Sequence, residues 1–380
     1  MEDASSGGVQ PQRFSASLPI RLSYGFFMVF GFAVGLLFHT NAMVWLSKWA
    51  IDRNGDCSAD CITNQAGYRS SFALFVFFLF HWTMSTKHNC CLDSSQRAAF
   101  NASHMVIRFL ALVVVILLTF VIPNDFFTIY AWFCVVISCI YLVVQLIVLI
   151  HFAYEWGDSW REKDEPQDLY GLLVATVTLY VGGLVLIAYL FKWFGNDSSC
   201  TVGQGILSIT IIMGVFYTVL SLLVKNGSLL PASVVFIYSA WTAYGGLSSG
   251  IPHGVCNQIG SSSTIEIITG AIVSAASLAL AATSAGGSKD AFQLAAYQRE
   301  KSPEEIEANG FAFFHVMLTM GSCYMAMLLT SWAITGTGGT SAWADSGTAS
   351  MWAKLGSEIM CIALYLWTLA APYVCTNRDF

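Results

Sequence analysis

Charged side chains are scarce in this sequence. Asp, Glu, Lys and Arg make up 11% of the 380 residues, whereas hydrophobic types make up 56%. A water-soluble domain carries roughly 25% charged residues to cover its surface. The deficit excludes a chain whose outer surface faces mostly water. The net charge of −6 and the lack of a long basic run also argue against nucleic acid as a partner.

Motifs of catalysis are lacking as well. The sequence has no His-Glu-x-x-His, no paired Cys-x-x-Cys and no nucleophile elbow. It also lacks a glycine loop that would cradle phosphates, so we expect no nucleotide to be bound or hydrolysed. We therefore predict a protein that is not an enzyme and that uses no cofactor and no metal.

What the sequence has is long apolar runs. A helix needs about 20 apolar residues to cross the hydrocarbon core, and only helices or closed barrels satisfy their backbone there. Ten runs fit, which predicts an all-α polytopic membrane protein: 22–47, 68–86, 104–122, 130–155, 169–194, 204–224, 231–248, 264–285, 311–334 and 351–374. A polar tail, 1–20, precedes a transmembrane domain, 21–380, whose longest cytosolic loop is 286–310.

The positive charges predict the orientation. With ten spans both termini lie on one side, and that side holds twelve of the 17 Lys and Arg residues. Cytosolic loops of membrane proteins carry the excess of Lys and Arg. We therefore expect cytosolic termini in a protein of the endomembrane system, the plasma membrane or both.

Four cysteines fall in the predicted lumenal loops: Cys57, Cys61, Cys200 and Cys256. An even number in an oxidising compartment favours disulfides. We favour Cys57 with Cys61 and Cys200 with Cys256, although four cysteines allow three connectivities.

Two cytosolic features relate to modification. Cys90 and Cys91 follow a span, which suits S-palmitoylation, although idle thiols explain them equally well. Asn101 begins an Asn-x-Ser sequon on the predicted cytosolic side, so we expect it to carry no glycan.

Polar residues within the spans are functional candidates, because ionisable groups are expensive there. They are His39, Asn41, His81, Gln145, His151, Glu155, Glu266, His315 and Glu358. His151 and Glu155 are four residues apart and share one helical face, followed by Trp156. The alternative is that this pair lies at the end of the span and that its side chains snorkel toward the membrane surface. Glu358 lies one turn after Lys354, which favours a structural ion pair.

The fourth span is too long for the membrane. From residue 130 to 160 it covers about 45 Å at 1.5 Å per residue, which exceeds the hydrocarbon core. A helix of this length must tilt or project into the cytosol. A strongly tilted helix between two bundles would leave lipid-facing crevices beside it.

Several motifs, in order along the chain, resemble those of the serine incorporator (Serinc) family. They are Ser94-Ser-Gln-Arg-Ala-Ala99, Gln145-Leu-Ile-Val-Leu-Ile-His-Phe-Ala153, Cys256-Asn257, Phe313-Phe-His-Val-Met-Leu318, Leu364-Tyr-Leu-Trp-Thr-Leu-Ala-Ala-Pro372 and Arg378-Asp-Phe380. The resemblance runs from about residue 20 to the C-terminus. One departure is His151, which stands where the family has an acidic residue.

The resemblance implies two four-helix bundles flanking a crossed pair of long tilted helices, here the fourth and ninth spans. It also implies ATP-independent scrambling of phospholipids such as phosphatidylserine, and a link to serine-derived lipids. The partners would be phospholipids and sphingolipids. A homo-oligomer is also compatible with the resemblance. On this interpretation five residues line a lipid groove: Gln145, His151, Glu155, Trp156 and His315.

Two other functions remain open at this point. A transporter of serine or another small solute would need broken half-helices, for which Gly182-Gly183 and Gly245-Gly246 are weak candidates. A non-catalytic scaffold for lipid-synthesis enzymes would concentrate its distinctive residues in the loop 286–310. Scrambling is favoured because it needs no catalytic constellation and no nucleotide.

Overall fold

A computed structural model describes most of the chain. The described residues are 11–39, 51, 59–86, 93–162, 165–224, 227–259, 303–332, 334 and 346–374. The predicted span 264–285 lies outside them, as do Asn41, Cys57, Cys90, Cys91 and Glu266. Within these ranges the regular structure is helical, as predicted.

The helices follow the predicted apolar runs closely. They are α1 (Pro11–His39), α3 (Ala59–Ser85), α4 (Ser94–Ala102), α5 (Met105–Thr119), α6 (Asn124–Glu162), α7 (Pro166–Phe194), α8 (Thr201–Leu223), α9 (Leu229–Gly250), α12 (Pro303–Leu329) and α13 (Ser346–Val374). Helix α1 begins at Pro11, inside the predicted polar tail 1–20.

Six of these helices are long and apolar enough to cross a membrane, or seven if the bent pair α4–α5 counts as one span. They are the helices α1, α6, α7, α8, α12 and α13. The predicted spans α3 and α9 are not in this set, but most of their side chains are buried among other helices. A helix shielded from lipid tolerates more polar residues. The protein is an integral membrane protein, and the total of ten spans stays a prediction.

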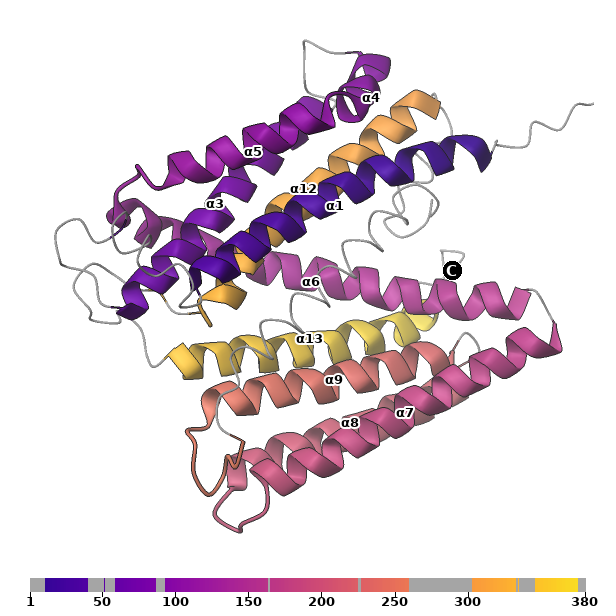
Figure 1. The fold of residues 1–380 in the computed structure, drawn as a ribbon. Helices are drawn as coiled ribbons and strands as arrows, with labels where there is room; N and C mark the ends of the chain where they lie inside the picture. Colours follow the sequence, from indigo (N-terminus) through magenta and orange to yellow (C-terminus); the bar gives the residue numbers. More distant parts are fainter. Residues whose placement is uncertain are drawn as a thin grey trace, which may run out of the picture.

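The described helices form two groups on either side of α6 (Figure 1). One group contains α1, α3, α4, α5 and α12, and the other contains α7, α8, α9 and α13. Helix α6 belongs to both cores, because Tyr141 packs in the first and Leu146 and Ile150 pack in the second. The four-plus-four arrangement around a crossed pair is not confirmed, because 264–285 is not described and α12 packs mainly on α3.

The predicted overlong fourth span is confirmed as one continuous helix. Helix α6 has 39 residues, which corresponds to about 58 Å. Its start is held by Arg69 of α3, whose side chain is 1% exposed. The Nη2 atom donates to the carbonyl oxygen of Ile122 at 2.9 Å and to Oδ1 of Asn124 at 2.8 Å, and the guanidinium lies 4.4 Å from the ring centroid of Phe127.

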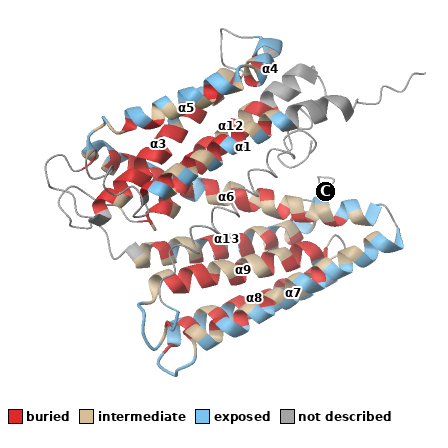
Figure 2. Cartoon of the chain, viewed as in Figure 1, coloured by how far each residue is buried: buried red, intermediate tan, exposed pale blue. Residues whose placement is uncertain are grey.

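The outer faces of the helices are apolar, as lipid contact requires. Figure 2 shows exposed strips along α5, α7 and α8. These strips carry large hydrophobic side chains such as Val106 (74% exposed), Val181 and Ile212. Apolar surface on this scale is rare on water-soluble monomers.

Glycines bring α7, α8 and α9 close together. A Cβ atom added at Gly183 of α7 or Gly214 of α8 would lie 2.7 Å from opposite edges of the Phe236 ring of α9. Small residues allow this kind of close packing in membranes. Gly182-Gly183 and Gly245-Gly246 both lie inside continuous helices. Neither pair therefore forms the broken half-helix that a solute transporter would need.

Candidate functional site

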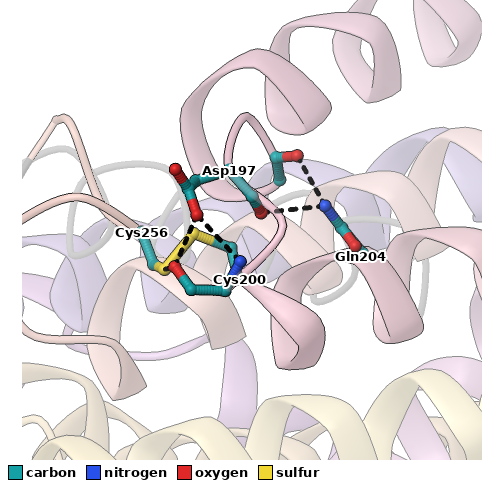
Figure 3. Close-up of a disulfide and its surroundings, with 6 residues drawn as sticks. Asp197, Cys200, Gln204 and Cys256 are labelled. Carbon is teal, nitrogen blue, oxygen red and sulfur yellow. Dashed lines mark hydrogen bonds between the residues drawn. A yellow bond between two sulfur atoms is a disulfide. The ribbon is translucent and has the colours of Figure 1, made fainter.

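The loops at one end of the second group are joined by a disulfide between Cys200 and Cys256, the predicted pair (Figure 3). Asp197 accepts hydrogen bonds from the backbone N–H and the hydroxyl of Ser199, and these bonds hold the pKa of the Asp197 carboxyl below its usual value. Cys61 is also disulfide-bonded, whereas its predicted partner Cys57 lies outside the described residues. Figure 1 shows the loop between α7 and α8, in which Cys200 lies, at the end of the molecule opposite α4.

One face of α6 carries buried polar side chains. Ser138, Tyr141 and Gln145 are spaced by three and four residues, so they lie on the same side of the helix. All three are buried, Gln145 with 3% of its surface exposed. The ring of Tyr141 lies 5.3 Å from that of Tyr324, so this face meets α12.

On this face Oε1 of Gln145 and Oγ of Ser138 have no hydrogen-bond partner among the residues that the structure describes. Most buried polar side-chain atoms are hydrogen-bonded, and one left without a partner costs about 1–3 kcal/mol. The two atoms therefore mark the part of α6 where a polar ligand or water would be stabilised most.

The predicted cytosolic end of α6 is aromatic and partly exposed. Trp156 stacks on Phe152 at 5.9 Å between ring centroids and meets the edge of Trp160 at 5.5 Å. His151 is half-buried and Glu155 is exposed. Among its described neighbours Glu155 forms no hydrogen bond or ion pair, so the shared helical face does not bring Glu155 into a bond with His151.

His315 has its polar contacts in the first helix group and not with the α6 residues. Its Nε2 atom lies 2.8 Å from Oδ1 of Asn101 in α4. Its ring meets the edge of Tyr24 in α1 at 4.6 Å, and the ring of His81 in α3 lies 5.5 Å away. The structure therefore does not bring His315 together with Gln145, as the predicted groove would require.

Asn101 was noted in the sequence only as a glycosylation sequon. Its side chain is fully buried and donates to Oγ of Ser85 at 3.0 Å and to the carbonyl oxygen of Arg97 at 2.9 Å. A glycan cannot be attached to a buried, hydrogen-bonded amide. No sequence signal identified Asn101 as the centre of a polar cluster, because its partners lie in α3, α4 and α12.

The remaining intramembrane residues are separated from this cluster. Glu358 is buried in α13 and accepts a hydrogen bond from Thr210 of α8 at 2.7 Å. Lys354 instead donates to the carbonyl oxygen of Gly245 at 3.0 Å, so the expected ion pair between Lys354 and Glu358 is not observed. His39 is the last residue of α1.

Metal coordination is not offered by the described residues, in which no three His, Cys, Asp or Glu side chains come together. The apolar outer faces, the long helix between two groups and the polar atoms buried between helices define a polytopic α-helical integral membrane protein. Its polar chemistry is concentrated where helices meet.

Comparison with known proteins gives the family. The family model described as "Serine incorporator (Serinc)" matches residues 7–309 and 301–378, so the chain belongs to the serine incorporator family. It is 26% identical to "Serine incorporator 3" of Bos taurus, over 83% of this chain and 80% of that protein. It is also 26% identical to "Serine incorporator 2" of Homo sapiens, over 95% of this chain and 91% of that protein.

Proposed function

We propose that this protein moves phospholipids such as phosphatidylserine between the two leaflets without ATP. The proposal rests chiefly on one observation: on the α6 face that meets α12, Oε1 of Gln145 and Oγ of Ser138 have no hydrogen-bond partner in the described part of the chain. A lipid headgroup cannot cross hydrocarbon unless polar groups replace part of its hydration. Oε1 of Gln145 and Oγ of Ser138 would accept hydrogen bonds from a passing ammonium or hydroxyl, or from water that accompanies it.

The position of α6 also supports a lipid path. It is the longest described helix and packs on both helix groups, so lipid tails beside it would stay in the membrane while headgroups pass along its polar face. His151, Glu155 and Trp156 lie at the end where a headgroup would enter from the predicted cytosolic side. The name of the relatives, serine incorporator, is consistent with a role in serine-derived lipids such as phosphatidylserine and sphingolipids.

The test is reconstitution of the purified full chain in liposomes that contain fluorescent phosphatidylserine and no ATP. A membrane-impermeant reductant destroys the fluorescence of the outer leaflet only. Scrambling brings inner-leaflet lipid outward, so we expect bleaching well beyond the half seen with protein-free liposomes. Bleaching that stops at half in liposomes shown to contain folded protein would refute the proposal.

Two variants on the same helix test the site separately. Gln145→Leu removes the amide with little change in volume, and we expect it to slow bleaching by about tenfold, because one hydrogen bond of about 1.4 kcal/mol corresponds to that factor. Cys139→Ala changes an exposed residue on another face of α6 and should leave the rate unchanged. If both variants scramble at the wild-type rate, the function stands but the Gln145 face is not the path.

A further inference from the structure

Three arginines are buried at the end of the first helix group that is predicted to face the cytosol: Arg21 of α1, Arg97 of α4 and Arg108 of α5, which are 3%, 5% and 8% exposed. The hydrogen-bond acceptors of Arg97 and Arg108 are seen in the structure. Arg97 Nη1 donates to the carbonyl oxygen of Ser85 at 3.3 Å. Arg108 donates to the hydroxyl of Tyr24 and to the carbonyl oxygen of Phe100, and its guanidinium lies 4.3 Å from the Phe100 ring centroid.

The acceptors of Arg97 and Arg108 are all neutral. Each is a backbone carbonyl or a hydroxyl, and neither arginine pairs with a carboxylate in the part of the chain that the structure describes. Nε of Arg97 is buried and has no hydrogen-bond partner within the described ranges. Burying a charge is expensive unless an opposite charge compensates it, so two guanidiniums held in this way form a site with an excess of positive charge.

His315 adds a third polar group to the same cluster. The Asn101 amide nitrogen donates to Ser85 and Arg97, which leaves Oδ1 to accept from Nε2–H of His315. Nδ1 of His315 then finds no partner among the described residues, in a side chain that is 0% exposed. The Tyr24 ring contacts both His315 and Arg108, which makes the cluster continuous.

The surface beside the cluster faces lipid. Ile107 and Leu110, which flank Arg108 on α5, are 61% and 57% exposed. Helices α4 and α5 meet at a bend of 72°. An amphiphile whose tails lie along α5 would therefore place its headgroup next to Arg108.

We propose that Arg97 and Arg108, with His315, bind a phosphate group. Guanidinium groups match phosphate oxygens in geometry and charge, and Nδ1 of His315 would accept the proton of a phosphate monoester or, once protonated, donate to it. Phosphatidic acid is the simplest lipid with this group, and a soluble phosphate is the other source. The site lies apart from the Gln145 face, so it does not depend on scrambling.

The experiment measures binding to the full chain purified in a neutral detergent. The probes are dioctanoyl phosphatidic acid, inorganic phosphate and dioctanoylglycerol, which has the tails without the phosphate. Binding is read as a rise in the thermal unfolding midpoint, and lipid retained from purification is read as a mass adduct by native mass spectrometry. The variants are Arg97→Gln, Arg108→Gln and Arg97→Lys, with Arg161→Gln as the control, because Arg161 is half exposed and lies near the predicted cytosolic surface.

We expect phosphatidic acid to stabilise the wild type and the Arg161→Gln control alike, and dioctanoylglycerol to have no effect. Each glutamine variant should need about tenfold more phosphatidic acid for the same effect, which corresponds to the loss of one charge-assisted contact. Stabilisation by inorganic phosphate as well would identify a soluble phosphate as the ligand source. Arg97→Lys keeps the charge, so it covers the case in which a glutamine variant fails to fold, and it should bind less tightly than wild type.

The proposal is wrong if neither phosphate probe stabilises the wild type and no phospholipid adduct is retained. It is also wrong if the folded Arg97 and Arg108 variants bind as tightly as the Arg161→Gln control. Neither result bears on scrambling, because that assay follows the movement of phosphatidylserine between leaflets and not the binding of a phosphate group.

Discussion

Replacing Arg69 with methionine should loosen the start of α6. Methionine has a similar length and no donors, so the variant leaves four acceptors without their charged partner: the carbonyl oxygen and Oε1 of Gln65, the carbonyl oxygen of Ile122 and Oδ1 of Asn124. Each hydrogen bond from a charged donor contributes about 1.5–3 kcal/mol, offset in part because the variant no longer buries a charge. We expect the free energy of unfolding to fall by about 3 kcal/mol.

The measurement is unfolding of the detergent-purified chain, with Arg161→Met as the matched control. Arg161 is half exposed and lies at the other end of α6, so its replacement should change the free energy of unfolding by less than about 0.5 kcal/mol. Arg69→Lys keeps the charge, but its single ammonium cannot reach the acceptors on Gln65, Ile122 and Asn124 together. Its free energy of unfolding should therefore lie between those of Arg69→Met and Arg161→Met. Equal stability of Arg69→Met and Arg161→Met would show that Arg69 does not hold α6 in place.

Three further predictions concern the second helix group. Gly183→Ala should destabilise the protein by about 1–3 kcal/mol, because the new Cβ would lie 2.7 Å from the ring of Phe236. Gly205→Ala is the control, because nothing lies within 4 Å of the new atom, and it should stabilise helix α8 by up to about 1 kcal/mol. Equal unfolding midpoints for Gly183→Ala and Gly205→Ala would refute the packing argument. Cys256→Ser should lower the free energy of unfolding by about 2–4 kcal/mol relative to the oxidised wild type. Because Cys61 is also disulfide-bonded, the check compares both proteins in reductant, where their unfolding midpoints should become equal. The lowered pKa of Asp197 means that its contribution to stability is present above the unfolded-state pKa and is lost as the pH falls through the folded-state pKa. Asp197→Asn should therefore show a smaller loss of stability in acid, and an unchanged acid slope would contradict this.

The first helix group shows why its site was only partly predictable. The apolar runs predicted α1, α3, α5 and α12, and His81 and His315 stood out as intramembrane polar residues. Asn101 did not stand out, because it is an ordinary polar residue in a short helix. What makes it central is contact with His315, 214 positions away in the sequence.

The sequence was sufficient to predict those features that depend only on consecutive residues. The scarcity of charge, the ten apolar runs and the length of the fourth span follow from the demands of the bilayer on consecutive residues, and they predicted a helical membrane protein with an overlong α6. The parity of lumenal cysteines favoured the Cys200–Cys256 bond, and motifs in order indicated the family.

Pairing between helices was decided only by the tertiary structure. Helical periodicity gives the face on which a residue lies but not the helix that will cover it, so Lys354 and Glu358 were expected to pair with each other. In the fold Glu358 meets Thr210 of α8, and Lys354 meets the Gly245 carbonyl of α9. For the same reason the sequence could not predict that His315 contacts Asn101, or that Oε1 of Gln145 has no hydrogen-bond partner in the described part of the chain. Each depends on which distant helix packs against the residue.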